Sequence, residues 1–252
     1  MKKVVYIFML LLGLSVSAQQ NALFDSATKA YNAGEYQTAV DTYLEILESG
    51  KHSAALYYNL GNAYYKMNQI APSIYYYEKA LLLKPNDAEI KNNLGYAQNM
   101  TLDAIDTIPE TGFAKIYNSV LRLLSFDQWA YAGVIFMILF VLLYIAFYYF
   151  RFSSRKRLSF ILSIVSLFFA IIAVVFAYVE YNAYQAERYA IVFAKEASVK
   201  SEPNLKSQEA FELHEGTKVN VLDELNQWKK IQIVDGTVGW IPAEDIKLIR
   251  DF

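Results

Sequence analysis

The sequence predicts a multidomain chain with three kinds of structure: an all-α repeat region, a two-helix transmembrane hairpin and a small all-β barrel. Three observations predict this order. A pattern with a 34-residue period fills residues 19–107, two uncharged apolar runs fill most of residues 127–180, and short alternating runs occupy residues 188–252. Paired helices, membrane spans of ~20 residues and half-buried strands have these three patterns, respectively.

Residues 19–107 contain two helical pairs and a capping helix. A shift of 34 residues brings Ala39 onto Ser73 and Tyr43 onto Tyr77, which gives repeats over residues 20–53 and 54–87. The second repeat has the clearest pattern, Tyr57-x-x-Leu60-Gly61-x-x-Tyr64, then Ser73-x-x-x-Tyr77-x-x-Ala80, then Pro85. This pattern resembles the tetratricopeptide repeat family, an all-α solenoid. Because two repeats and a cap are few to close a core, we expect help from a partner or from packing beside the membrane.

Family members bind extended peptides or helices on a concave face formed by the first helix of each unit. By this resemblance, the protein-binding groove comprises Phe24, Tyr31, Tyr58, Asn62, Tyr65, Lys66, Asn92 and Tyr96. The family's carboxylate clamp needs several Lys and Arg with Asn, and only Lys66, Asn62 and Asn92 resemble it, so we expect no clamp. A tyrosine-lined groove suits a peptide, because Tyr gives a large contact area with a polar tip. Ordinary packing between repeats is the alternative for each tyrosine.

The two apolar runs predict transmembrane helices over residues 128–150 and 158–179, joined by a basic loop over residues 151–157. The loop contains four cations, Arg151, Arg155, Lys156 and Arg157. Short loops rich in Lys and Arg stay cytoplasmic. We therefore expect a two-pass inner-membrane protein, in contact with the lipid bilayer, whose soluble domains both lie on the exported, periplasmic side.

Small residues recur along the second apolar run at spacings of 4, 3, 4, 3 and 4. This membrane packing seam comprises Ser159, Ser163, Ser166, Ala170, Ala173 and Ala177. Such a face lets membrane helices approach closely. It predicts either packing against the first span or a docking face for another membrane protein.

Two further segments flank these regions. Lys2 and Lys3, an apolar run and a small-residue site predict a secretory signal peptide over residues 1–18, with an uncleaved anchor as the alternative. Residues 108–126 predict a linker and then an amphipathic juxtamembrane helix, or alternatively a helix that binds a partner or the repeats. Ser125 and Gln128 are placed to form a capping box at the start of the first span.

Residues 188–252 show the period-two pattern of short strands, and Asp235-Gly236 is a hairpin turn signal. The segment resembles bacterial SH3-like domains through its signature residues Gly216, Trp228, Gly239 and Trp240. Gly239 is expected to permit a tight turn before Trp240 and Ile241, which we expect to pack in the core. The resemblance implies an all-β barrel outside the cytoplasm that binds cell-wall peptides or proteins.

Composition and motifs argue against nucleic-acid binding, metal binding and catalysis by this chain. A net charge of −2 gives no electrostatic case for nucleic acid, and no cysteine is present. The two histidines, His52 and His214, are isolated in sequence, and we expect both on the surface. No metal-ligand spacing, phosphate-binding loop or nucleophile motif is present. We therefore expect a non-enzymatic protein without a catalytic, cofactor-binding or metal site.

The order of the modules resembles the BatE-type proteins of the Bacteroides aerotolerance (Bat) operon family. That resemblance implies a membrane-anchored periplasmic scaffold, sister proteins with von Willebrand factor A domains as partners, an AAA+ ATPase in the same system, and a role in oxidative-stress tolerance or envelope integrity. The alternative is a cell-wall module that binds peptidoglycan peptides and recruits an envelope enzyme through its repeats. A transporter subunit is disfavoured, because the spans carry no ionisable residue.

Overall fold

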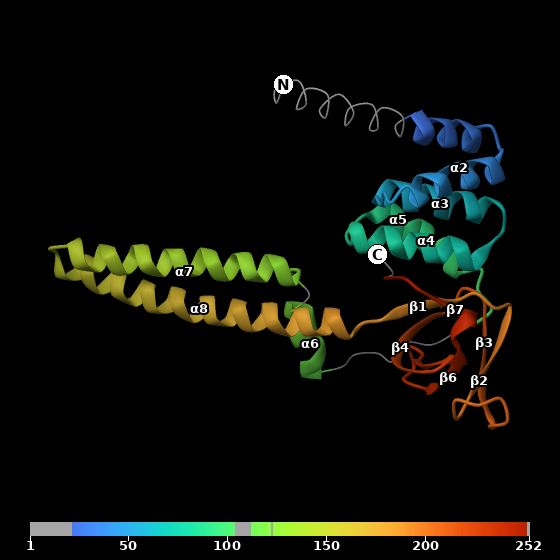
Figure 1. Cartoon of the computed structure of the whole chain (residues 1–252). Coiled ribbons are helices and arrows are strands. Elements are labelled where there is room, and N and C mark those ends of the chain that lie inside the picture. The colour runs from blue at the N-terminus through green and yellow to red at the C-terminus, as the bar shows by residue number, and fades with distance from the viewer. Residues whose placement is uncertain (1–21, 104–111, 122, 251–252) are drawn as a thin grey trace, which may run out of the picture. The chain divides into compact units, whose positions relative to one another are not determined.

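The computed structural model describes residues 22–103, 112–121 and 123–250. The chain forms two compact units, one of Met1–Thr107 with Arg188–Phe252 and one of Ile108–Glu187. Figure 1 shows the elements of each. The predicted signal peptide, residues 1–18, and the start of the predicted linker, residues 108–111, lie outside the described residues.

The first unit begins with the two predicted helical pairs and the capping helix. A helix over residues 22–32 pairs with α2 (Tyr36–Glu48), α3 (Ala54–Lys66) pairs with α4 (Ile70–Leu83), and α5 (Ala88–Gln98) follows. Side-chain oxygens of Ser53 and Asp87 cap the starts of α3 and α5. Asn68 makes the turn before α4 with φ 57°, a left-handed conformation that Asn tolerates.

The repeat core consists largely of small and aromatic residues. Tyr43, Tyr57, Leu60 and Tyr77 are almost fully buried. A Cβ on Gly61 would lie 2.6 Å from the ring of Tyr77, so α3 and α4 approach closely only because this position has no side chain. The small residues of the repeat pattern therefore mark the positions where the two helices of a repeat touch.

The β-domain is an antiparallel, seven-stranded sheet in the order β3-β2-β6-β5-β4-β1-β7. Alternate residues point inward, and the core includes Val199, Val219, Ile231 and Ile241. Asp235-Gly236 turns the chain from β5 to β6, with Gly236 at φ 89°. The strands are β1 (Tyr189–Val192), β2 (Glu196–Lys200), β3 (Glu209–His214), β4 (Lys218–Leu225), β5 (Trp228–Gln232), β6 (Val238–Pro242) and β7 (Ile246–Leu248), with a 3₁₀ turn at Ala243–Asp245.

Two expectations for this domain are wrong. Trp240 does not pack in the core, because Gly239 and Ile241 are buried and the period of two places Trp240 on the opposite, partly exposed face. Gly239 does not precede the strand either. It lies within β6, where a Cβ would collide with Val199 of β2, so this glycine allows two strands to approach.

The repeats and the β-domain share one hydrophobic core. Ile191 and Ile249 of the β-domain pack in the same cluster as Ile74 and Tyr77 of the second repeat. The rings of Tyr75 and Phe193 meet edge to face at 5.5 Å. We expected this cover from a partner or from the membrane, but it comes from the chain's own β-domain.

The second unit contains α6 (Gly112–Leu121), α7 (Phe126–Tyr149) and α8 (Ser153–Ala186). By length and composition, α7 and α8 can each cross a membrane. Ser125 and Gln128 form the predicted capping box at the start of α7. The predicted seven-residue loop over residues 151–157 is wrong in length. Only residues 150–152 separate the helices, because α8 already begins at Ser153 and includes three of the four cations of the predicted loop.

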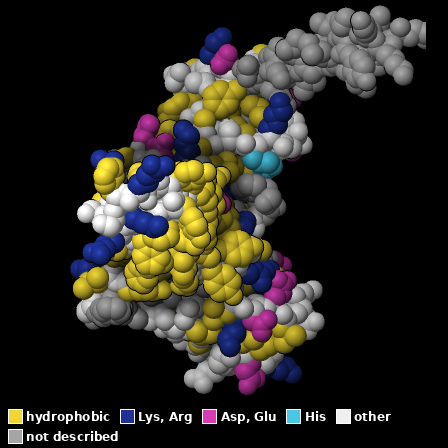
Figure 2. Space-filling model, turned by 90° about the vertical axis from the view of Figure 1, so that its left-hand side faces the viewer, with side chains coloured by type: hydrophobic (Ala, Val, Ile, Leu, Met, Phe, Trp, Pro, Cys, Tyr) yellow, Lys and Arg dark blue, Asp and Glu magenta, His cyan; other side chains and the backbone are white. Residues whose placement is uncertain are grey.

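Small residues lie where α7 and α8 touch. Five members of the seam, Ser159, Ser163, Ser166, Ala170 and Ala173, are buried, while Ala177 is partly exposed. The Ser166 hydroxyl donates to the Phe136 carbonyl oxygen at 2.7 Å. Gly133 lies against Val174 in the same contact. The seam therefore faces α7 within the hairpin, and large hydrophobic side chains are exposed on the outside of the two helices. Figure 2 shows hydrophobic side chains gathered in a patch near the centre of the face in view.

Candidate functional site: a tyrosine-lined pocket in the repeats

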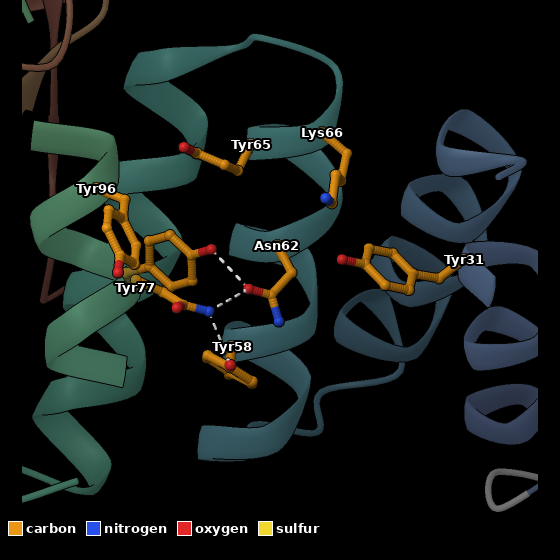
Figure 3. Close-up of a pocket in the computed structure, with 8 residues that line it drawn as sticks. Tyr31, Tyr58, Asn62, Tyr65, Lys66, Tyr77 and Tyr96 are labelled. Atoms are coloured by element: carbon orange, nitrogen blue, oxygen red, sulfur yellow. Dashed lines mark hydrogen bonds between the residues drawn. The ribbon is translucent and has the colours of Figure 1, made fainter. Parts of the chain in front are cut away.

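A pocket of about 270 Å³ opens on the repeat region between the first helix, α3 and α5. Its polar side chains point toward a common space (Figure 3). Eight residues line it: Tyr31, Tyr58, Asn62, Tyr65, Lys66, Tyr77, Asn93 and Tyr96.

A hydrogen-bond network holds the inner wall of the pocket. Asn62 Oδ1 accepts bonds from the Tyr77 hydroxyl at 2.6 Å and from Asn93 Nδ2 at 2.9 Å. Asn93 Nδ2 also donates to the Tyr58 hydroxyl at 2.8 Å, and that hydroxyl donates to Glu89 Oε1 at 2.7 Å. The network joins α3, α4 and α5, so these side chains are already ordered before a ligand arrives.

Both tyrosines of the network stay neutral over the ordinary pH range. Burial, followed by the hydrogen bond to Glu89, raises the pKa of Tyr58 to about 12. Burial is also the main cause that raises the pKa of Tyr77. Their hydroxyls therefore remain hydrogen-bond donors and hold Asn62 and Glu89 in place.

The pocket mouth carries the groups that remain available to a ligand. No hydrogen-bond or ion-pair partner is found for Lys66 among the residues that the structure describes. Its ammonium group points toward the Tyr31 hydroxyl and Asn62, and the amide nitrogen of Asn62 faces the same space (Figure 3). Tyr96 is 61% exposed at the rim. The mouth thus offers hydrogen-bond donors, one positive charge and aromatic surface.

The structure brings together six of the eight residues predicted for the groove: Tyr31, Tyr58, Asn62, Tyr65, Lys66 and Tyr96. Phe24 does not reach the pocket, because its ring packs on Tyr43 at 5.5 Å in the first repeat's core. Asn92 is exposed on α5 outside the pocket, and Asn93 takes the expected place. The sequence pattern places Tyr77 in the repeat motif but did not predict it for the groove, whereas the structure shows that it lines the pocket.

The outward face of the β-domain presents a second polar arrangement. Trp240 lies opposite Lys230 on one neighbouring strand and opposite Lys200 on the other. Lys200 also pairs with Glu209 at 3.5 Å. Of the other signature residues, Trp228 pairs with Pro242 across the sheet, while Gly216 faces the repeats. Among the described residues, no His, Cys, Asp and Glu side chains gather to hold a metal ion.

Two family models match parts of the chain. The model described as tetratricopeptide repeat matches residues 54–87, and the bacterial SH3 domain model matches residues 195–247. Both families are typically non-catalytic binding modules, and no enzyme family is found. No curated protein matches the chain. The chain thus combines a tetratricopeptide repeat, two apolar helices and an antiparallel all-β domain of the bacterial SH3 type.

Proposed function

We propose that this chain is a membrane-anchored scaffold whose repeat pocket binds an extended peptide segment of a partner protein. The observation that carries this proposal is the pre-ordered network of Tyr58, Asn62, Tyr77 and Asn93 beneath the donor-rich mouth. A pocket that is ordered in advance binds at a lower entropic cost.

The chemistry of the mouth indicates what the peptide presents. Asn62 Oδ1 already accepts two bonds, and the Tyr58 hydroxyl donates to Glu89 Oε1. Lys66 and the Asn62 amide nitrogen therefore favour ligand acceptors, namely peptide carbonyl oxygens and one acidic group. With a single cation, the site suits one carboxylate beside aromatic or aliphatic side chains that pack on Tyr31, Tyr65 and Tyr96.

The membrane assignment rests on α7 and α8, and the bacterial SH3 match favours the cell envelope. Arg151, Arg155, Lys156 and Arg157 at the tip of the hairpin support a cytoplasmic turn. Under that topology both binding modules lie on the exported, periplasmic side of the inner membrane. An anchor that holds two binding modules near one surface raises the effective concentration of their partners.

The order of modules further supports a role like that of the Bat operon scaffolds. In that case the partners are sister proteins with von Willebrand factor A domains, and the complex serves oxidative-stress tolerance or envelope integrity. The repeat and SH3 matches support the modular part of this proposal.

Peptide selection against the full chain in lipid nanodiscs tests the pocket. Random peptides enriched on the protein should carry an acidic residue and bind the wild-type chain. Lys66→Gln should weaken them about tenfold, which corresponds to ~1.4 kcal/mol. Lys29→Gln, an exposed lysine of the first helix outside the pocket, is the matched control. Equal affinities of the two variants would exclude the pocket as the binding site.

A second candidate function rests on the outward face of the β-domain. There Lys200 and Lys230 flank Trp240, a pattern that fits the carboxylates and apolar stems of cell-wall peptides. In this alternative the domain binds peptidoglycan and the repeats recruit an envelope enzyme. Full chain in detergent should then sediment with purified peptidoglycan, and Trp240→Ala should release it. No retention of the wild-type chain would exclude this function.

A further inference from the structure

A compact polar cluster joins the end of the repeats to the β-domain. Asp103 follows α5 and has a side chain that is only 11% exposed. Its Oδ2 accepts from the His214 backbone N–H at 2.7 Å and from the Thr217 hydroxyl at 2.5 Å. Its Oδ1 lies 2.7 Å from His214 Nδ1. The expectation that His214 is an ordinary surface residue is therefore wrong, because the fold brings it to a carboxylate 111 residues away in the chain.

The contacts around this cluster are close and partly charged. A Cβ on Gly216 would lie 2.8 Å from Thr101 and 3.0 Å from Ile74, so the turn after β3 fits tightly against the repeats. Beside it, Lys218 pairs with Glu78 of α4 at 2.8 Å. These groups lie at the end of β3, on the turn to β4, at the start of β4, or on the residues of the repeat region that contact them.

The same cluster is connected to the pocket through α5. This helix carries Glu89, Asn93 and Tyr96 of the pocket and its network, and it ends at Gln98, five residues before Asp103. Fixing Asp103 on the β-domain therefore fixes the C-terminal end of the helix that forms one wall of the pocket.

We propose that Asp103, His214 and Thr217 form a pH-sensitive latch that holds the SH3-like domain against the repeats. Closed, the latch makes the peptide pocket and the β-domain one rigid recognition body. Weakened, it leaves the docking to the hydrophobic core shared by Ile74, Tyr77, Ile191 and Ile249, so the β-domain shifts more widely against the end of the repeat array. The proposal concerns the docking of two modules and does not depend on the identity of the peptide.

The direction of the pH effect follows from the charges that face His214. The hydrogen bond to Asp103 is the main cause that raises the pKa of His214, and the charges of Asp103, Glu212 and Glu196 raise it further against desolvation. Docking therefore favours the protonated imidazole. This contribution is complete below the ordinary histidine pKa near 6.5 and is lost as the pH rises through the higher docked value.

Asp103 sets the acidic limit of the latch. Burial opposes its ionisation, but the hydrogen bonds from the His214 backbone, Thr217 and the His214 side chain together lower its pKa below the ordinary value. Its contribution is therefore present above that ordinary value and is lost as the pH falls through the lowered one. The latch is strongest at mildly acidic pH.

Spin-label distance measurement on the full chain in nanodiscs tests this proposal. Because the sequence has no cysteine, Lys91→Cys on α5 and Glu202→Cys on the β-domain give two defined label positions. The distribution of distances between the two labels should be narrow at about pH 5.5 and should gain a broad component at about pH 9. These two pH values lie on either side of the ordinary histidine pKa. Circular dichroism of each variant checks that it is folded.

Two substitutions and one control decide the outcome. His214→Gln should abolish the pH dependence, while His52→Gln, the only other histidine, should keep it. Asp103→Asn should give the broad component already at acidic pH. A wild-type distribution that does not change with pH, or a pH dependence that survives His214→Gln, would overturn the proposal. So would an Asp103→Asn variant that behaves as the wild type does.

Discussion

Gly216 of the SH3-like domain lies against Ile74 of the second repeat so closely that a Cβ would come within 3.0 Å of the isoleucine Cδ1 atom. Gly216 has φ 92°, and Ile74 is fully buried in the core that the two modules share. The contact therefore requires glycine for both its conformation and its size. This turn therefore adds a close contact to the hydrophobic core that the two modules share.

Gly216→Ala should destabilise the first unit by about 2–5 kcal/mol, because a positive-φ penalty adds to overpacking. Gly236→Ala is the matched control. It has nearly the same φ, 89°, but no atom lies within 4 Å of its Cβ position, so only the conformational penalty of about 1–2 kcal/mol applies. Chemical unfolding followed by tryptophan fluorescence measures both. Equal losses would show that Gly216 does not fit against the repeats.

A second glycine pair tests the repeat core. Gly61→Ala should destabilise the repeats by about 1–3 kcal/mol, because the added methyl group meets the Tyr77 ring at 2.6 Å. Gly95→Ala on α5 has open space around its Cβ and should stabilise by about 0.5–1 kcal/mol through helix propensity. Thermal unfolding followed by the helical circular-dichroism signal compares the stabilities of the two variants. A stabilising Gly61→Ala would contradict the close approach of α3 and α4.

The free energy of unfolding at alkaline pH should depend on the ionisation of the Tyr58 hydroxyl. A folded pKa raised to about 12 means that the folded state favours the neutral phenol, so stability falls as the pH rises from about 10 through that value. Tyr58→Phe should lose about 1–2 kcal/mol at neutral pH, since its bonds to Glu89 and Asn93 are absent, and should decline less steeply in alkali. Denaturant unfolding between pH 8 and 12 measures this, with Tyr96→Phe as a control for loss of an exposed hydroxyl. An unchanged alkaline slope would argue against a buried neutral phenol.

Membrane topology can be tested with single cysteines in the cysteine-free chain. Under the proposed orientation, a membrane-impermeant maleimide added to intact spheroplasts should label Asn226→Cys in the β-domain and should not label Ser154→Cys at the start of α8. After the membrane is permeabilised, both should react. The reverse labelling before permeabilisation would place the soluble modules in the cytoplasm.

Local chemistry made much of the fold predictable. The capping box of Ser125 and Gln128 and the turn at Asp235-Gly236 each depend on residues that are neighbours in sequence. The 34-residue period likewise reports contacts between adjacent helices, such as Gly61 with Tyr77. Such contacts leave a regular trace in the sequence.

Contacts between distant segments left no such trace. Asp103 and His214 are each isolated in sequence, so their pairing could not be inferred. On α5, one step along the helix turns a side chain by about 100°, which was enough to exchange Asn92 for Asn93 in the pocket. Trp240 was misassigned because its strand phase depends on which neighbours, Gly239 and Ile241, face the core.

Site-specific photo-crosslinking of an enriched peptide tests the central claim, that the repeat pocket is the peptide-binding site. A photoreactive residue replaces either Tyr96, 61% exposed at the pocket rim, or Leu102, 76% exposed after α5 and outside the pocket lining. If the peptide binds in the pocket, position 96 should give an adduct that unlabelled peptide competes away, and position 102 should give none. Equal adducts from both positions, or an adduct from position 102 alone, would contradict it.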